Sequence, residues 1–295
     1  MTILPKNNRR GQEHPFCLPP APALAGILNL TEDSFSDGGK YFHLQDALSQ
    51  GEKLLREGAF LLDVGAESTR PGAEEIPPEK ELEKLLPFLA AFREKHPGAI
   101  ISIDTRKSMV AEKALLAGAD IINDVSGLRF DPAMKEVAAR YGCPLILMHS
   151  RGTPKDMQDS RNLDYGKDFL AAFCEEVEAM IQKALSSGIA REKIILDPGL
   201  GFAKTPEQNW ELIRQCRFLR ERFALPLFYG CSRKSFLSLP SGSTLSLEER
   251  ESVHLAILGF LGDEGADFFR VHDVKSAGNF LAARRILCRG GNLPG

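Results

Sequence analysis

The sequence predicts a single (β/α)8 barrel, a fold of the α/β class, and three observations lead to that prediction. Strand-like and helix-like segments alternate eight times along the 295 residues. The strand-like segments are continuous apolar runs, as expected for parallel strands covered on both faces. Polar residues follow these segments, and barrels of this kind carry their active sites at those strand ends. A doubly wound open sheet is the second possibility, and it requires that one or two strands are misassigned.

The individual elements follow from apolar runs and from helical apolar spacing. The expected strands are 23–30, 59–65, 99–104, 120–126, 144–150, 193–199, 226–230 and 267–273. The expected helices are 44–57, 78–96, 107–117, 131–141, a long amphipathic helix through 169–184, 205–222, 248–262 and 275–287. In the second helix, for example, Leu82, Leu85, Leu89 and Phe92 fall on one face.

The bulk composition excludes several classes of protein. The net charge of -3 and the pI near 6.1 give no general attraction to nucleic acid or to an anionic membrane. No apolar run approaches the ~18–20 residues that cross a bilayer. The scattered cysteines form no CxxC pair, which favours free thiols in the cytoplasm. Residues 1–22 hold a basic cluster but no signal-peptide core, so we expect a flexible lead-in before one barrel domain at 23–290.

Polar side chains gather at the C-terminal ends of the expected strands. Taken singly, an Asp or Asn after a strand is usually a turn former or a helix cap. Because a barrel brings all its strand ends to one mouth, the whole set predicts an active site there. In chain order the set is Asn29, Asp63, Asp104, Asn123 with Asp124, Met148 with His149, Asp197, the GCSRK turn (230–234), and Arg270 with His272.

One part of this set combines hydrogen-bond acceptors with apolar surface and an ammonium group. Paired carboxylate and amide acceptors suit a flat heterocycle with adjacent N–H donors, such as an amino-oxo pyrimidine ring. The lysine is available to donate to a carbonyl or a nitrogen of that ring. The residues of this part are Asp104, Asn123, Asp197, Met148, Phe202 and Lys234.

The other part is cationic and consists of Arg70, Arg270 and His272. The fork of an arginine matches the geometry of a phosphate group. Asn29 offers a neutral oxygen that suits one position of a hydrated Mg²⁺ whose other ligands are phosphate oxygens and water. The two parts together indicate a heterocycle that carries a phosphorylated leaving group.

Eight motifs in order, from about Ala25 to Val274, make the chain similar to the dihydropteroate synthase family. They are GILNLTEDSFSDGG (26–39), DVGAESTRPGA (63–73), SIDTRK (102–107), IINDVSG (121–127), LMHSRGTP (147–154), DPGLGFAKTPEQN (197–209), GCSRKSF (230–236) and RVHDV (270–274). The resemblance implies a homodimeric transferase of folate biosynthesis, a target of sulfonamides that uses Mg²⁺. It would condense 6-hydroxymethyl-7,8-dihydropterin pyrophosphate with 4-aminobenzoate to give 7,8-dihydropteroate and pyrophosphate.

The resemblance also implies a role for each motif residue. The pterin residues would be Asp104, Asn123, Met148, Asp197 and Lys234. The pyrophosphate residues would be Arg70, Arg270 and His272, with Asn29 as the metal ligand. The aminobenzoate residues would be Phe35, Thr69, Pro71, Phe202 and Ser232. Catalysis would rest on Asn29, Thr69, Arg70, Lys234, Arg270 and His272, with no protein nucleophile, because the aryl amine attacks.

Four positions depart from the family motifs, and one of them is Cys231, before Ser232, where small residues are common. Glu32 stands where the first loop usually has proline, which removes a φ constraint and adds a carboxylate near the expected metal site. Ala66 and Ala203 replace usual glycines, and both are tolerated if they hold negative φ. The polar loop after GILN is expected to close over the substrates, with Phe35 covering the aminobenzoate ring.

Three other functions remain open from the sequence. A methyltetrahydrofolate methyltransferase shares the acidic pocket but has no use for the SRK and RVH motifs. A Schiff-base aldolase could use Lys234, although Arg233 and the acidic pocket would favour the protonated amine. A catalytically silent pterin-binding paralogue is distinguished only by assay.

Overall fold

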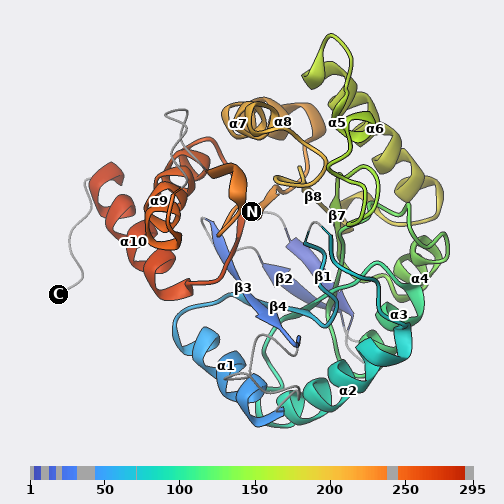
Figure 1. Cartoon of the computed structure of the whole chain (residues 1–295). Coiled ribbons are helices and arrows are strands. Elements are labelled where there is room, and N and C mark those ends of the chain that lie inside the picture. Colours follow the sequence, from blue (N-terminus) through green and yellow to red (C-terminus); the bar gives the residue numbers. More distant parts are fainter. Residues whose placement is uncertain are drawn as a thin grey trace.

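The structure of the protein, a computed structural model, describes residues 3–7, 13–17, 22–31, 44–70, 72–237 and 245–289. Eight parallel strands form the predicted (β/α)8 barrel, and helices surround it (Figure 1). The barrel strands are β3 (Ala23–Asn29), β4 (Leu61–Gly65), β5 (Ile101–Asp104), β6 (Ile121–Asp124), β7 (Leu145–Met148), β8 (Ile194–Asp197), β9 (Phe228–Tyr229) and β10 (Phe268–Val271).

The barrel closes in sequence order. Each neighbouring pair from β3 to β8 is parallel, and β10 pairs with both β3 and β9. A parallel bridge between Leu196 and Leu227 joins β8 to the segment that enters β9. All C-terminal strand ends therefore open at one mouth.

The helices agree with the expected segments, with one exception. The segment 205–222 is two helices, because Gln215 leaves helical geometry between them with φ -90 and ψ 14. A short helix, α5, also lies in the connection after β7. The helices are α1 (Leu44–Arg56), α2 (Pro78–Lys95), α3 (Ser108–Leu116), α4 (Met134–Tyr141), α5 (Ser160–Leu163), α6 (Phe169–Ser186), α7 (Pro206–Arg214), α8 (Cys216–Phe223), α9 (Leu247–Asp263) and α10 (Val274–Arg289). Within the described ranges, none of them is long and apolar enough to cross a membrane.

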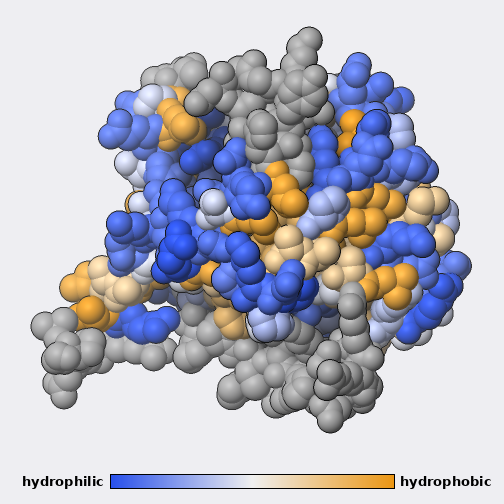
Figure 2. Space-filling model, turned by 90° about the horizontal axis from the view of Figure 1, so that it is seen from below, coloured by the Kyte–Doolittle hydropathy of each residue, from blue (hydrophilic) through white to orange (hydrophobic). Residues whose placement is uncertain are grey.

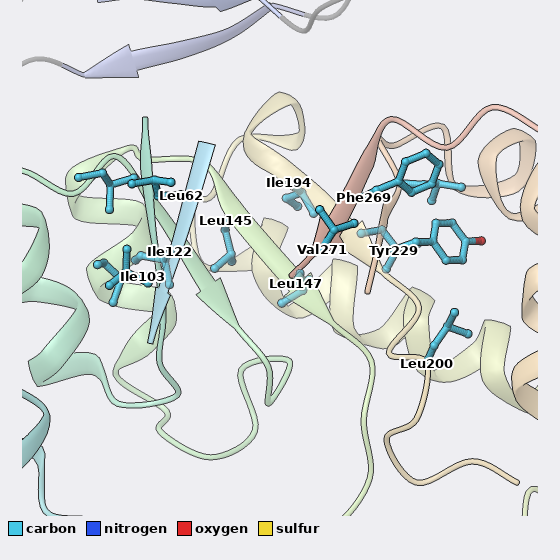
Figure 3. Packing of buried hydrophobic residues seen from close by; sticks show 14 of the residues in the cluster. Leu62, Ile103, Ile122, Leu145, Leu147, Ile194, Leu200, Tyr229, Phe269 and Val271 are labelled. Atoms are coloured by element: carbon cyan, nitrogen blue, oxygen red, sulfur yellow. The ribbon is translucent and has the colours of Figure 1, made fainter. Parts of the chain in front are cut away.

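Two apolar layers stabilise the barrel. The outer layer lies between strands and helices, and Figure 3 shows part of it, including Leu62, Ile103 and Ile122. The inner layer fills the barrel interior and contains Ala23, Ala25, Leu61, Ile121, Ile146, Ile195, Phe228 and Phe268. Because successive side chains of a strand point to opposite faces, these two layers alternate along each strand.

The N-terminal segment contains a hairpin that the sequence analysis did not expect. Strand β1 (Ile3–Asn7) pairs antiparallel with β2 (Glu13–Cys17). Strand β1 contacts the 3₁₀ turn η2 (Arg191–Lys193), which leads directly into β8. The hairpin therefore lies across the N-terminal end of the barrel, opposite the mouth (Figure 1).

Candidate active site

The polar side chains of the predicted site follow the inner apolar layer at a spacing of two residues. This spacing places them on the same, inward face of each strand, one step closer to the mouth. The pairs are Leu61 and Asp63, Ile121 and Asn123, Ile146 and Met148, Ile195 and Asp197, and Phe268 and Arg270. Asp104 occupies the corresponding position of β5, directly beside Asn123 in the strand register. We call the inward residues Asp63, Asp104, Asn123, Met148, Asp197 and Arg270 the polar layer.

An ion-pair cluster occupies the centre of the polar layer. The guanidinium of Arg270 donates from Nε to Asp63 and from Nη2 to Asp104, the latter at 2.7 Å. Asp63 is fully buried and also accepts hydrogen bonds from Ser102 and Asn123. Sequence reasoning assigned Arg270 to the cationic part, and the structure shows that its guanidinium also lies among the acceptors. The central role of Asp63 was missed, although its position at a strand end marked it.

Two buried acceptors of the polar layer have no hydrogen-bond partner within the described residues: Asp104 Oδ1 and Asn123 Oδ1. Unpaired buried acceptors are costly, by about 1–3 kcal/mol each, unless a ligand pairs with them. Burial raises the pKa of Asp104 to about 7, although Arg270 opposes that shift. The two oxygens therefore suit a bound molecule that presents N–H groups.

Asp197, Lys234 and Phe202 form a second wall. Asp197 accepts from the Gly199 backbone N–H at 2.7 Å. Burial raises the pKa of Asp197, and Lys234 is the largest opposing influence. Burial lowers the pKa of Lys234 to about 8, with Asp197 opposing. The Lys234 ammonium donates to the Leu200 carbonyl and lies 4.4 Å from the centre of the Phe202 ring.

Of the expected leaving-group residues, Arg270 belongs to the polar layer, whereas His272 and Arg70 lie at the rim. Ser232 Oγ and His272 Nδ1 are 3.0 Å apart, so the loop after β9 contacts the end of β10. Burial, together with the positive charges of Arg233, Arg270 and Arg70, lowers the pKa of His272 to about 3. His272 is therefore neutral next to positive charge, which favours the arrival of an anion.

The remaining rim residues are on loops. Asn29 is half-buried at the end of β3, and Thr69 is half-buried on the loop after β4. Arg70, the next residue, is exposed. Phe35, Pro71 and Glu32 lie outside the described residues, so their expected roles stay predictions.

A groove of about 310 Å³ lies beside the mouth and reaches Thr69 and Phe202. Its walls come from the loops after β4, β5, β6, β7 and β8. Sequence reasoning did not anticipate Arg106, Arg129 or Phe130 in this wall. Thr69 and Phe202, two of the residues expected around the aminobenzoate, are part of its lining.

Lys204 supports the loop that carries Phe202. Its buried ammonium donates to the backbone carbonyls of His149, Gly199 and Phe202 at 3.0 to 3.3 Å. It thereby joins the loops after β7 and β8. Burial lowers the pKa of Lys204 to about 7, against the attraction of Asp197. The lysine of GFAK was visible in the sequence, but nothing in the motif indicated these backbone contacts.

The two substituted glycine positions differ in their backbone. Ala203 has φ 48, in the left-handed region, so the condition of negative φ is not met at this position. Ala66 is not among the described non-glycine residues with positive φ, which agrees with the expectation there. Ala203 is fully buried, and its carbonyl accepts from Tyr165 at 3.1 Å, which holds the unusual conformation in place.

The donor set around Asn29 bears on the expected metal. Within the described ranges there is no group of three or more His, Cys, Asp or Glu side chains that could enclose a metal ion. A single amide oxygen at the rim fits a Mg²⁺ that keeps several waters and is held mainly by substrate phosphates.

Comparisons with known proteins agree with this geometry. A family model described as "Pterin binding enzyme" matches residues 25–272. A dihydropteroate synthase of a Synechocystis species is 44% identical over 268 residues, which is 90% of this chain and 89% of the relative. A Clostridium difficile dihydropteroate synthase solved with pteroic acid superposes with a TM-score of 0.83 at 34% identity, covering 93% of this chain and 99% of that one. The Yersinia pestis dihydropteroate synthase in a sulfonamide complex superposes with a TM-score of 0.84 at 34% identity, covering 97% of this chain and 100% of that one.

Proposed function

The chain belongs to the dihydropteroate synthase family of pterin-binding enzymes, and we propose that its polar layer binds the pterin ring and its rim the pyrophosphate and the aminobenzoate. Its function is that of the family: a transferase that condenses 6-hydroxymethyl-7,8-dihydropterin pyrophosphate with 4-aminobenzoate in folate synthesis. The two unpaired acceptors, Asp104 Oδ1 and Asn123 Oδ1, carry the assignment of the pterin site.

The pterin ring pairs with the acceptors of the polar layer. Asp104, Asn123 and Asp197 receive its N–H groups, and Lys234 donates to its carbonyl or ring nitrogen. Met148 contributes apolar contact from the end of β7. The buried carboxylates also stabilise positive charge that develops on the pterin methylene as the leaving group departs.

The rim receives the pyrophosphate. Arg70 and Arg270 supply charge-assisted donors, and His272 lies next to both positive charges. Asn29 would hold Mg²⁺, which supplies charge neutralisation of the phosphate oxygens when it is bound. The residue chemistry supports these roles, because charge on the leaving group lowers the barrier to its departure.

The aminobenzoate lies between the rim loops, with Thr69, Phe202 and Ser232 around it. Its amine nitrogen uses its lone pair to form the C–N bond to the pterin methylene. The C–O bond to pyrophosphate breaks, the electron pair leaves with the oxygen, and the amine loses one proton. Correct placement of the two substrates is the main contribution of the loops.

We also propose a homodimer that works in the cytoplasm. Apolar side chains are exposed on the two adjacent helices α9 and α10: Leu247, Phe260, Ile286 and Leu287. Figure 2 shows apolar surface at the left of the molecule, where α10 ends. Such a surface suits contact with a second copy. The four described cysteines with free thiols, Cys143, Cys174, Cys216 and Cys231, fit a reducing compartment.

A coupled assay tests the function directly. The purified chain is given Mg²⁺, the pterin pyrophosphate and 4-aminobenzoate, and the release of pyrophosphate and formation of dihydropteroate are measured. We expect both products in equal amounts. Binding of the pterin without any product would instead identify a silent paralogue.

A further inference from the structure

Behind the loop that carries Thr69 and Arg70 lies a buried group of charged side chains without an assigned role. Glu67 and Glu81 are the anions, and Arg106 and Lys107 are the cations. Lys107 Nζ is 2.8 Å from Glu67 and 2.5 Å from Glu81. Arg106 Nε donates to Glu67 at 3.1 Å. All four residues are buried, so solvent screens these pairs little.

The same group holds both ends of one loop. Glu67 stands at the start of the loop and accepts from the Ile76 backbone N–H at 3.1 Å. Lys107 donates to the Ile76 carbonyl at 2.7 Å. The N–H and C=O of Ile76, at the far end of the loop, are thus both bound to the buried pair. Residues 68–70 and 72–75 follow from this base, and most of them are exposed.

Other contacts extend the connection to neighbouring loops. The Arg106 guanidinium lies 4.0 Å from the centre of the Phe130 ring, on the loop after β6. The Gly72 N–H donates to the Pro154 carbonyl at 2.8 Å, on the loop after β7. Both partners line the groove beside the mouth. A shift of the loop base would therefore move one wall of the site.

The packing of the helix after the loop does not rest on this group alone. Helix α2, which follows the loop, is docked by its own buried apolar face, including Leu85, Phe88 and Phe92. Glu81 is the one acidic residue among the buried residues of α2. Its carboxylate accepts hydrogen bonds from Thr105 and Lys107. Against the effect of burial, hydrogen bonds from Arg106 and Lys107 lower the pKa of Glu67, so this carboxylate is charged at neutral pH.

We propose that Glu67 and Lys107 form a buried clamp that fixes the loop of residues 68–75, and that Lys107 is a positioning residue for the reaction. The clamp rests on the proposed function, because its effect on catalysis acts through Thr69 and Arg70. Lys107 follows Asp104 by three residues, so the SIDTRK motif supplies both a pterin acceptor and the support for the opposite substrate. The two halves of the site are then held in a fixed relation.

Lys107→Met tests the clamp. It keeps an unbranched side chain of similar length but removes the charge and the two hydrogen bonds that the ammonium makes to Glu67 and Ile76. We expect kcat to fall about 10-fold or more, since displacement of substrate-positioning groups by about 1 Å is costly. The KM for 4-aminobenzoate should rise about 5-fold or more by the same displacement. The Kd for 6-hydroxymethylpterin should stay within about twofold, because the polar layer is untouched.

Amide hydrogen exchange of residues 68–76 gives a readout that does not depend on activity. We expect faster exchange in Lys107→Met and Glu67→Gln, and slow exchange restored in Lys107→Arg. Glu67→Gln is nearly isosteric and retains an acceptor for Ile76, so it serves if Lys107→Met does not fold. The control is Lys113→Met, an exposed lysine on α3, which should behave as wild type.

Three outcomes overturn the clamp: unchanged exchange at 68–76 in folded variants, faster exchange with unchanged kcat and KM, or an equal loss of pterin binding. An inactive wild-type chain would overturn the proposed function instead. The exchange experiment would still decide whether the clamp holds the loop.

Discussion

The two halves of the active site are held by different means. The proposed pterin half is carried on strands, and most of its side chains are buried, with Arg270 already paired to Asp63 and Asp104. The rim half, proposed for pyrophosphate and aminobenzoate, is carried on loops, where Arg70 is exposed and Thr69 is half-buried. The difference indicates that the heterocycle enters a preformed site, whereas the second substrate meets groups whose position depends on loop supports.

The charges of the polar layer are paired within the protein, although two of its acceptor oxygens are not. Arg270 neutralises two buried carboxylates that would otherwise carry unpaired charge. The same arginine is expected to bind pyrophosphate, so it belongs to both halves. Substitution of Arg270 should therefore impair both halves of the site at once.

Arg270→Ala should have the largest effect of the changes considered. We expect turnover to fall about 10²-fold or more, as for the loss of one preorganised donor to developing charge. The Kd values for 6-hydroxymethylpterin and for the pterin pyrophosphate, measured by fluorescence titration, separate the two roles. If Arg270 binds the leaving group, the substitution should weaken binding of the pterin pyrophosphate more than binding of 6-hydroxymethylpterin. The control is Arg56→Ala, at an exposed arginine. Turnover of Arg270→Ala within threefold of wild type, or equal to that of the control, would contradict the assignment.

Asp63→Asn should have the next largest effect. The amide keeps one acceptor but turns a donor toward Asn123 and Arg270, which are donors themselves. We expect the Kd for pterin to rise about 10-fold, in line with loss of a charge-assisted bond of about 1.5–3 kcal/mol. Ser102→Ala removes a neutral donor to the same carboxylate and is the matched control. Equal effects of the two substitutions would show that the charge of Asp63 is unimportant.

Asp104→Asn should change how stability depends on pH. The pKa of Asp104 in the folded protein is about 7, above its ordinary value of 3.8. The folded state therefore binds more protons than the unfolded state between these values, and stability from this group falls as pH rises from about 4 to 7. Between pH 5 and pH 7.5, the free energy of unfolding of wild type should fall relative to Asp104→Asn by about 1 kcal/mol or more. Parallel profiles from urea unfolding would be evidence against a buried Asp104 with a raised pKa.

The strand-borne half could be predicted from the sequence, and much of the loop-borne support could not. A period of two residues links Leu61 to Asp63 and Ile195 to Asp197, so alternation within a strand already indicates which side chains face inward. The clamp of Glu67 and Lys107 joins residues 40 positions apart through contacts with the backbone of Ile76. Side-chain bonds to a distant backbone leave no periodic pattern. The hairpin of β1 and β2 was not predicted, because its two short strands contain prolines and lie beside a basic cluster, a composition more typical of an irregular segment.

Ala203→Gly should have the smallest effect and tests whether loop strain matters. Replacing an alanine at positive φ relieves about 1 kcal/mol of strain. Loss of a buried methyl costs about 0.8 kcal/mol. Greater freedom of the unfolded chain costs a further ~0.4–1 kcal/mol. We therefore expect a change of less than about 1 kcal/mol in the free energy of unfolding, from urea denaturation.

Activity should change even less than stability in Ala203→Gly. Lys204 still binds the Phe202 carbonyl, and Tyr165 still binds the carbonyl of residue 203, so the ring of Phe202 should keep its place. We expect kcat and the KM for 4-aminobenzoate within about twofold of wild type, since the contacts that position Phe202 are retained. A larger rise in that KM would show that the methyl group of Ala203, rather than Lys204, sets the position of this loop. The loop-borne half would then depend on local backbone strain as well as on buried charges.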